Sequence, residues 1–129
     1  MRIQSFILAL GCMTVAGSAL AADHPGKAVF DRTCAMCHTP TGAGMPGVFP
    51  PLAKSDYFLK ATPGHLVHIL DKGLQGEVTV NGQKYNNIMP PQSLSDADAA
   101  AVINYVSEGL NGGKPLVQPA QVPKLKVAQ

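Results

Sequence analysis

The chain has 129 residues, of which 46% are hydrophobic, 14% charged and 5% aromatic. This length predicts one domain of ordinary size and argues against two. Ten basic and eight acidic side chains give a formal charge of +2, which is too small to indicate a nucleic-acid-binding protein. Trp is absent and Phe and Tyr number four and three, so the chain builds only a thin core from its own side chains. A bulky apolar group held inside the fold would supply the missing volume.

Residues 1–21 are typical of a secretory signal peptide. Arg2 gives the positive start, Phe6–Ala16 is an apolar stretch, and Ala19–Ala21 form an A-x-A cleavage site. The apolar stretch is too short to predict a transmembrane helix. Cleavage leaves 108 residues of the 129, lowers the formal charge to +1 with the loss of Arg2, and predicts a soluble protein in the periplasm. Cys12 is lost with the signal, although its surroundings faintly resemble a lipoprotein cleavage site.

Short helices and long loops are predicted in the first half of the mature chain. Ser55 and Thr62 are typical residues at the start of a helix, and Gly73 is typical of a helix end. Proline suits the first turn of a helix. The predicted elements are a helix over residues 25–37, a Gly- and Pro-rich loop over 39–51, a helix over 56–60 and a helix over 63–72.

The second half predicts a small ribbon, one longer helix and a tail. Asn81 and Gly82 between β-prone residues indicate a hairpin within residues 77–85. Ser95 precedes a helix that continues to Leu110 and ends at Asn111, Gly112 and Gly113. Prolines and the lack of helical periodicity predict an extended tail over residues 114–129. The sequence therefore predicts an all-α domain over residues 22–113, with three or four short helices, a small β-hairpin and a C-terminal tail.

The most specific motif is C-x-x-C-H, formed by Cys34, Cys37 and His38. This motif is the attachment signature of a c-type haem. Two thiols three residues apart at a helix end reach the two vinyl groups of one porphyrin edge, and the adjacent histidine then lies under the iron. Covalent attachment holds the haem in place, and the porphyrin supplies the core volume that the chain lacks.

A pair of cysteines such as Cys34 and Cys37 also has three interpretations that do not involve haem. A thioredoxin-like redox pair needs a βαβ frame, which the sequence does not show. A structural disulfide is a second interpretation. A zinc site needs further ligands, and no other cysteine remains in the mature chain. Export and the adjacent His38 favour one covalently bound haem c.

Methionine is one source of a second iron ligand. Met36 lies between the two cysteines and cannot reach the opposite face of the haem. Met45 lies only seven residues beyond His38 and is expected on the same side as that histidine. Met89 is followed by two prolines that hold an extended loop, and such a loop delivers a side chain to the distal face. Met89 is therefore the predicted axial ligand.

Histidine offers the alternatives. His65 and His68 lie three residues apart on a predicted helix, which leaves open a bis-histidine haem or a separate metal site. His24 precedes the first helix and is expected to be exposed to solvent.

From Gly26 to about Leu110 the chain resembles the class I cytochromes c, the small secreted monohaem electron carriers. The C-x-x-C-H motif near the start of the mature chain, the Met-Pro-Pro loop at residues 89–91 and the closing helix match the family in order and spacing. The resemblance implies the cytochrome c fold, wrapped around one covalently attached haem whose iron is held by His38 and Met89.

Further roles follow from the resemblance alone. It implies that the Pro50 carbonyl accepts a hydrogen bond from His38 and that Leu52 packs on the porphyrin. It also implies that the first and last helices cross at Gly26, against Phe30 and Tyr105. The hairpin before the Met89 loop resembles a variant found in cytochrome subunits of bacterial periplasmic dehydrogenases and reductases.

The function expected on this basis is transfer of single electrons between redox proteins, without catalysis. A thioether ligand favours Fe(II) and raises the potential relative to a bis-histidine iron. An apolar shell formed by Leu52, Phe58, Leu66, Ile69 and Ile88 raises it further. Electrons leave by the exposed edge that carries the thioethers. Five lysines are candidates for steering a partner, at positions 27, 54, 60, 72 and 84.

Two alternatives to a freely diffusing carrier remain open at this stage. One is a cytochrome subunit bound permanently to a periplasmic dehydrogenase or reductase, with residues 114–129 lying along the partner. The other is a haem enzyme or gas-binding protein with an open sixth position on the iron.

Overall fold

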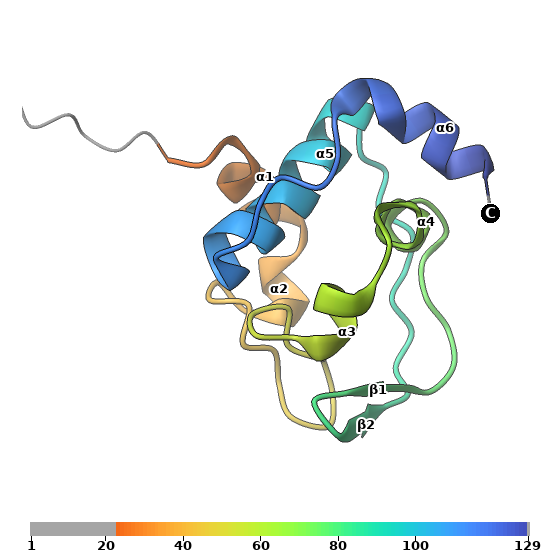
Figure 1. Cartoon of the computed structure of the whole chain (residues 1–129). Helices are drawn as coiled ribbons and strands as arrows, with labels where there is room; N and C mark the ends of the chain where they lie inside the picture. Colours follow the sequence, from red (N-terminus) through yellow and green to blue (C-terminus); the bar gives the residue numbers. More distant parts are fainter. Residues whose placement is uncertain (1–22, 129) are drawn as a thin grey trace, which may run out of the picture.

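The computed structural model of the chain describes residues 23–128 as short helices and one two-stranded sheet (Figure 1). The predicted signal peptide lies outside the described residues. Within residues 23–128, every helix is too short or too polar to cross a membrane. The elements are α1 (Pro25–Thr33), α2 (Ala35–His38), α3 (Asp56–Lys60), α4 (Pro63–Lys72), β1 (Val78–Val80), β2 (Gln83–Tyr85), α5 (Asp96–Tyr105), a π-helical turn η1 (Val106–Leu110), a 3-10 turn η2 (Pro119–Gln121) and α6 (Val122–Val127).

Local sequence signals account for most of these boundaries. The hydroxyls of Ser55, Thr62 and Ser95 each accept the backbone N–H three residues further on, at 3.1 to 3.2 Å, and so start α3, α4 and α5 as predicted. Asn81 and Gly82 form the turn between the antiparallel strands β1 and β2. The predicted hairpin is therefore confirmed.

The helix predicted over residues 25–37 is divided at Cys34. The backbone of Cys34 departs from regular helical geometry, with φ at −105°. Its carbonyl oxygen still accepts the N–H groups of Cys37 and His38, at 3.2 and 2.9 Å. The result is a separate four-residue helix, α2, that carries Cys37 and His38.

The crossing of α1 and α5 forms the centre of the core (Figure 1). A Cβ atom on Gly26 would lie 2.6 Å from the carbonyl carbon of Ala101 and 2.7 Å from the Cβ of Tyr105. Only glycine permits this approach of the two backbones. Phe30 is fully buried, and its ring centroid lies 5.3 Å from that of Tyr105. The contact implied by the family resemblance is confirmed.

The prediction of an extended tail over residues 114–129 is wrong for its second half. η2 and α6 form there and pack on α4 and α5, at the end of the molecule opposite the hairpin (Figure 1). Pro119 and Pro123 suggested an interruption, but both lie in the first turn of a helical segment, where the missing N–H has no helical partner to lose. Val117 and Val122 are buried within this chain.

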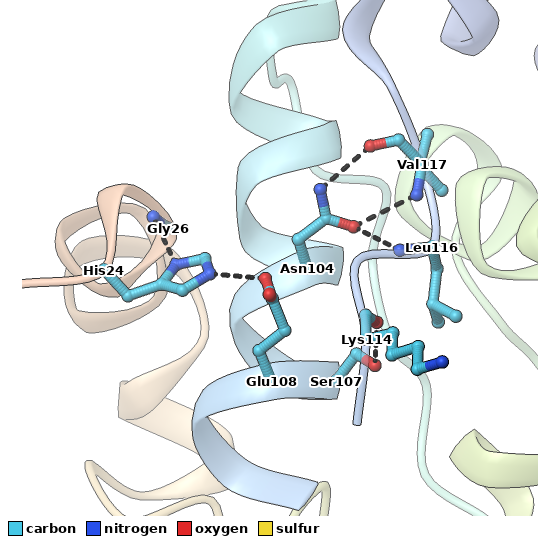
Figure 2. Close-up of polar contacts among 8 residues, drawn as sticks. All are labelled: His24, Gly26, Asn104, Ser107, Glu108, Lys114, Leu116 and Val117. Atoms are coloured by element: carbon cyan, nitrogen blue, oxygen red, sulfur yellow. Dashed lines mark hydrogen bonds and ion pairs between the residues drawn. The ribbon is translucent and has the colours of Figure 1, made fainter. Parts of the chain in front are cut away.

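The extended first half of the tail is held by the side chains of α5 and η1 (Figure 2). The Asn104 carboxamide accepts the N–H groups of Leu116 and Val117 at 2.7 and 3.0 Å and donates to the Val117 carbonyl at 2.8 Å. The Ser107 hydroxyl donates to the Lys114 carbonyl at 2.7 Å. The tail is therefore bound to its own domain along its length.

His24 is half-buried, so the expectation that it is exposed to solvent is wrong. Its Nδ1 accepts the Gly26 N–H at 3.1 Å and thereby caps α1. The ring proton consequently lies on Nε2, which donates to the Glu108 carboxylate at 2.9 Å (Figure 2). This pair joins the start of α1 to η1, a contact between positions 84 residues apart that no local pattern predicts.

Candidate cofactor site

A cavity of about 310 Å³ gathers the residues singled out in the sequence. Six of them line it: Cys34, Cys37, His38, Pro50, Leu52 and Met89. Most of the remaining wall is apolar. The side chains predicted as an apolar shell all line the cavity, namely Leu52, Phe58, Leu66, Ile69 and Ile88. Ile88 is 65% exposed.

His38 is held in one orientation and one tautomer. The ring is buried, with 8% of the residue exposed, and its Nδ1 lies 2.8 Å from the carbonyl oxygen of Pro50. A carbonyl only accepts, so Nδ1 carries the proton and Nε2 keeps its lone pair. Burial lowers the pKa of His38, while the bond to Pro50 opposes that shift. The ring is therefore neutral at pH 7, as a metal ligand must be.

The two cysteines differ in their exposure. Cys34 is buried and Cys37 is half-buried, and both lie in the cavity wall. Burial, with a smaller contribution from the nearby Cys37, raises the pKa of the Cys34 thiol to about 11. Cys34 is therefore a protonated thiol at neutral pH.

The loop around Met89 is fixed by the residues that directly follow α4. The backbone N–H and carbonyl of Met89 pair with those of Leu74, each at 2.9 Å. Gly73 adopts φ +80° and lies so close that a Cβ there would collide with the Met89 carbonyl and reach Pro91 N at 3.0 Å. The sequence predicted Gly73 only as a helix end. Its second role, the close approach of the Met89 loop, required the folded chain.

Comparison with known proteins now decides the family. The sequence matches the family model for cytochrome c over residues 24–109. The chain belongs to the cytochrome c family. Membership implies haem c as the cofactor, and it agrees with the helical architecture and the small sheet described above.

Relatives of this cytochrome include both separate proteins and a subunit of an enzyme. It is 40% identical to cytochrome c-552 of Thermus thermophilus over 85 residues, which cover 63% of this chain and 65% of that protein. It is 28% identical to cytochrome c2 of Rubrivivax gelatinosus over 82 residues, 64% of this chain and 93% of that protein. It is also 29% identical to the cytochrome c subunit of the quinone alcohol dehydrogenase of Gluconacetobacter polyoxogenes, over 79% of this chain but 22% of that subunit. The match thus spans just under two thirds of the Thermus protein's length.

The chemistry of the cavity fits a haem. Two thiols, a neutral imidazole and a thioether are the donor groups, and the surrounding wall is mostly apolar. Among the residues that line the cavity in the described chain, Arg32 is the one with a permanent charge, and it is paired with Asp98 at 2.8 Å. This composition suits a flat, largely apolar macrocycle better than a small polar substrate.

The other candidate iron ligands lie away from the interior of this cytochrome's cavity. Met36 lies on its rim but is 92% exposed, and Met45 is exposed and does not line it. Neither His65 nor His68 lines the cavity. His65 instead lies beside Tyr57, whose hydroxyl is 2.9 Å from its Nε2.

One residue that positions the site was not predicted from the sequence. The Asn111 amide donates to the Leu52 carbonyl at 2.9 Å, and its side-chain oxygen accepts the Lys54 N–H at 2.7 Å. Asn111 therefore fixes the loop that carries Leu52 against the end of η1. With Gly112 and Gly113 beside it, Asn111 was interpreted as part of a helix end, and its contacts with Leu52 and Lys54 were not predicted.

Proposed function

We propose that this chain is a periplasmic monohaem cytochrome c that carries single electrons between redox proteins. The observation that carries the proposal is the gathering of Cys34, Cys37, His38 and Met89 in the wall of one mostly apolar cavity. The signal-like residues 1–21 support export to the periplasm.

Cys34 and Cys37 are proposed to hold the haem covalently. Addition of each S–H across a vinyl group forms one C–S and one C–H bond and leaves nothing to be expelled. The protonated Cys34 thiol carries the hydrogen atom that the new C–H bond requires. Cys37 lies on α2 and Cys34 directly precedes that helix, so the two thioethers would hold the porphyrin edge beside His38.

His38 and Met89 are proposed as the axial ligands of the iron. When bound, the haem supplies a one-electron Fe(II)/Fe(III) couple. Pro50 orients the His38 ring through its carbonyl, and Leu74 holds the backbone of Met89. With His38 and Met89 both bound to the iron, no substrate would reach it, and these two side chains would need little rearrangement when its charge changes.

The apolar wall is proposed to favour the reduced form. Leu66, Ile69 and Phe58 exclude water from one side of the cavity. A low local dielectric disfavours the additional positive charge of Fe(III), and the soft thioether of Met89 acts in the same direction. Together they place the expected potential above that of a bis-histidine haem.

Binding of carbon monoxide separates this function from that of an open-site enzyme or gas-binding protein. The reduced wild-type protein is expected to keep its visible spectrum under carbon monoxide, because Met89 occupies the sixth position. The Met89→Ala variant is expected to bind the gas, since alanine offers no ligand. Rapid binding by the wild type at neutral pH would contradict the carrier proposal.

A permanently bound subunit of a periplasmic dehydrogenase or reductase is the second candidate. The similarity to the dehydrogenase subunit, which extends over 79% of this chain, is the observation that favours it. The tail gives no further support for a bound subunit, because Val117 and Val122 are buried in this domain. Purification from the native cells distinguishes the two candidates: a carrier elutes alone, whereas a subunit elutes with a larger polypeptide.

A further inference from the structure

We propose that Asn111, at the end of η1, is a positioning residue for the iron ligand His38. The proposal rests on the proposed function, in which His38 is an axial ligand. Asn111 acts through the loop that contains Pro50 and Leu52, where the Pro50 carbonyl accepts the hydrogen bond from His38 Nδ1 at 2.8 Å. The geometry of that hydrogen bond influences how strongly the imidazole donates electrons to a metal.

The Asn111 side chain is fixed by its own turn and in turn holds the loop. Its amide nitrogen donates to the Val106 carbonyl at 2.8 Å and to the Leu52 carbonyl at 2.9 Å. Its side-chain oxygen accepts the Lys54 N–H at 2.7 Å. Both N–H groups of the amide and its oxygen are therefore engaged, which leaves the side chain a single orientation.

The end of η1 contacts the loop at a second place. Leu110 packs against Gly42, where a Cβ atom would lie 2.7 Å from the Leu110 Cδ1. The Gly42 carbonyl accepts the N–H groups of Leu52 and Ala53 at 2.8 and 2.9 Å. Short π-helical turns such as η1 occur frequently at functional sites. This one brings two successive residues onto the loop that follows His38.

Lys54 is held in an unfavourable backbone conformation between two asparagines. Its φ is +53°, in the left-handed region that is costly for residues other than glycine. Asn111 holds its N–H, and the Asn81 amide donates to its carbonyl at 3.0 Å. Such a conformation persists only where the surroundings impose it. Loss of the Asn111 contact is therefore expected to let the backbone relax at this end of the loop.

A stiff connection links Leu52 to the hydrogen bond of His38. The ring of Pro51 fixes its φ, so few free dihedral angles separate the Pro50 carbonyl from the Leu52 carbonyl. A shift of Leu52 consequently displaces Pro50. His38 is buried, so water does not readily replace a weakened bond at Nδ1. The imidazole then becomes a weaker donor, which favours Fe(II) and raises the reduction potential.

The haem-loaded Asn111→Leu variant tests the proposal. Leucine is close to asparagine in size and uncharged, so the substitution removes three hydrogen bonds without adding a charge. Asn104→Leu is the matched control. Asn104 also makes three hydrogen bonds, but they hold Leu116 and Val117 of the tail, which do not line the cavity (Figure 2).

Two measurements separate positioning of His38 from a general loss of stability. Nuclear magnetic resonance of the reduced protein gives the exchange rate of the His38 Nδ1–H with solvent, divided by that of the buried Ile103 amide in α5. Asn111→Leu is expected to raise this ratio by about tenfold. Voltammetry with a soluble mediator is expected to show a higher potential. Asn104→Leu is expected to lower stability but to leave the ratio and the potential at their wild-type values.

Wild-type values of both quantities in Asn111→Leu would overturn the proposal, as would equal changes in the two variants. If Asn111→Leu does not take up haem, the wild type decides the question through exchange in low concentrations of denaturant. The His38 Nδ1–H and the Lys54 N–H are then expected to show the same dependence on denaturant, because one opening of the loop exposes both. Different dependences would overturn the proposal.

The proposed function is tested separately in the wild type by the same voltammetry. Absence of a reversible one-electron couple would sink the electron-carrier function itself. A reversible couple that is unchanged in Asn111→Leu, together with an unchanged exchange ratio, would sink only the role of Asn111.

Discussion

Replacement of both Cys34 and Cys37 by Ser is expected to abolish covalent haem binding. Each cysteine supplies one thioether, and serine oxygen does not add to a vinyl group under the same conditions. Haem staining after denaturing electrophoresis is expected to fall from full signal to none. The intact mass of the remaining polypeptide is expected to equal that of the chain alone.

Met36→Ser is the matched control for this experiment. Met36 lies between the two cysteines and is 92% exposed, so its truncation removes neither a site of haem attachment nor core packing. The control is expected to stain at the wild-type level. Haem that stays attached to the double serine variant after denaturation would show that Cys34 and Cys37 are not the attachment sites.

Gly26→Val is expected to lower the free energy of unfolding by about 3 kcal/mol or more. The first carbon of the new side chain collides with the Ala101 carbonyl, where α1 crosses α5, and a backbone obstacle cannot rotate away. A loss of this size is a large part of the ~5–15 kcal/mol that stabilises a typical domain. Denaturant unfolding of the haem-loaded protein, followed by circular dichroism, measures it.

Ala28→Val in the same helix provides the comparison. Ala28 is exposed, so the substitution costs only the lower helix propensity of valine, less than about 1 kcal/mol. If both variants unfold at the same denaturant concentration, the close crossing at Gly26 does not limit the stability of the fold.

The sequence predicted those parts of the fold that short-range signals determine. The hydroxyl caps at Ser55, Thr62 and Ser95 and the Asn81–Gly82 turn act within four residues, and the structure confirms all of them. The hydrogen bond from His38 to Pro50 was expected from the family resemblance alone, and the structure shows it at 2.8 Å.

Contacts between distant segments could not be predicted in this way. Pro119 and Pro123 in the tail indicated an interruption, yet the buried Val117 and Val122 outweigh that signal and allow η2 and α6 to form. Asn104 holds the tail by bonds that exist only after the fold has brought it close.

The candidate site shows the same division. Cys34, Cys37, His38 and Met89 were found from their types and spacing, and all four line one cavity. Gly73 and Asn111, which fix the loops of Met89 and Leu52, were interpreted only as helix ends. Glycine and asparagine are common after a helix, so the helix end alone explains the residue type. The sequence therefore does not indicate a second, long-range contact at these positions.

The visible spectrum of the oxidised protein, beside that of its Met89→Ala variant, tests the central claim most directly. Iron held by His38 and Met89 is predicted to give the wild type a weak long-wavelength band from the sulfur–iron bond. That band is predicted to vanish in the variant, while the thioether-linked haem remains. A wild type without the band, or a variant that keeps it, would contradict ligation by Met89 and favour an open sixth position on the iron.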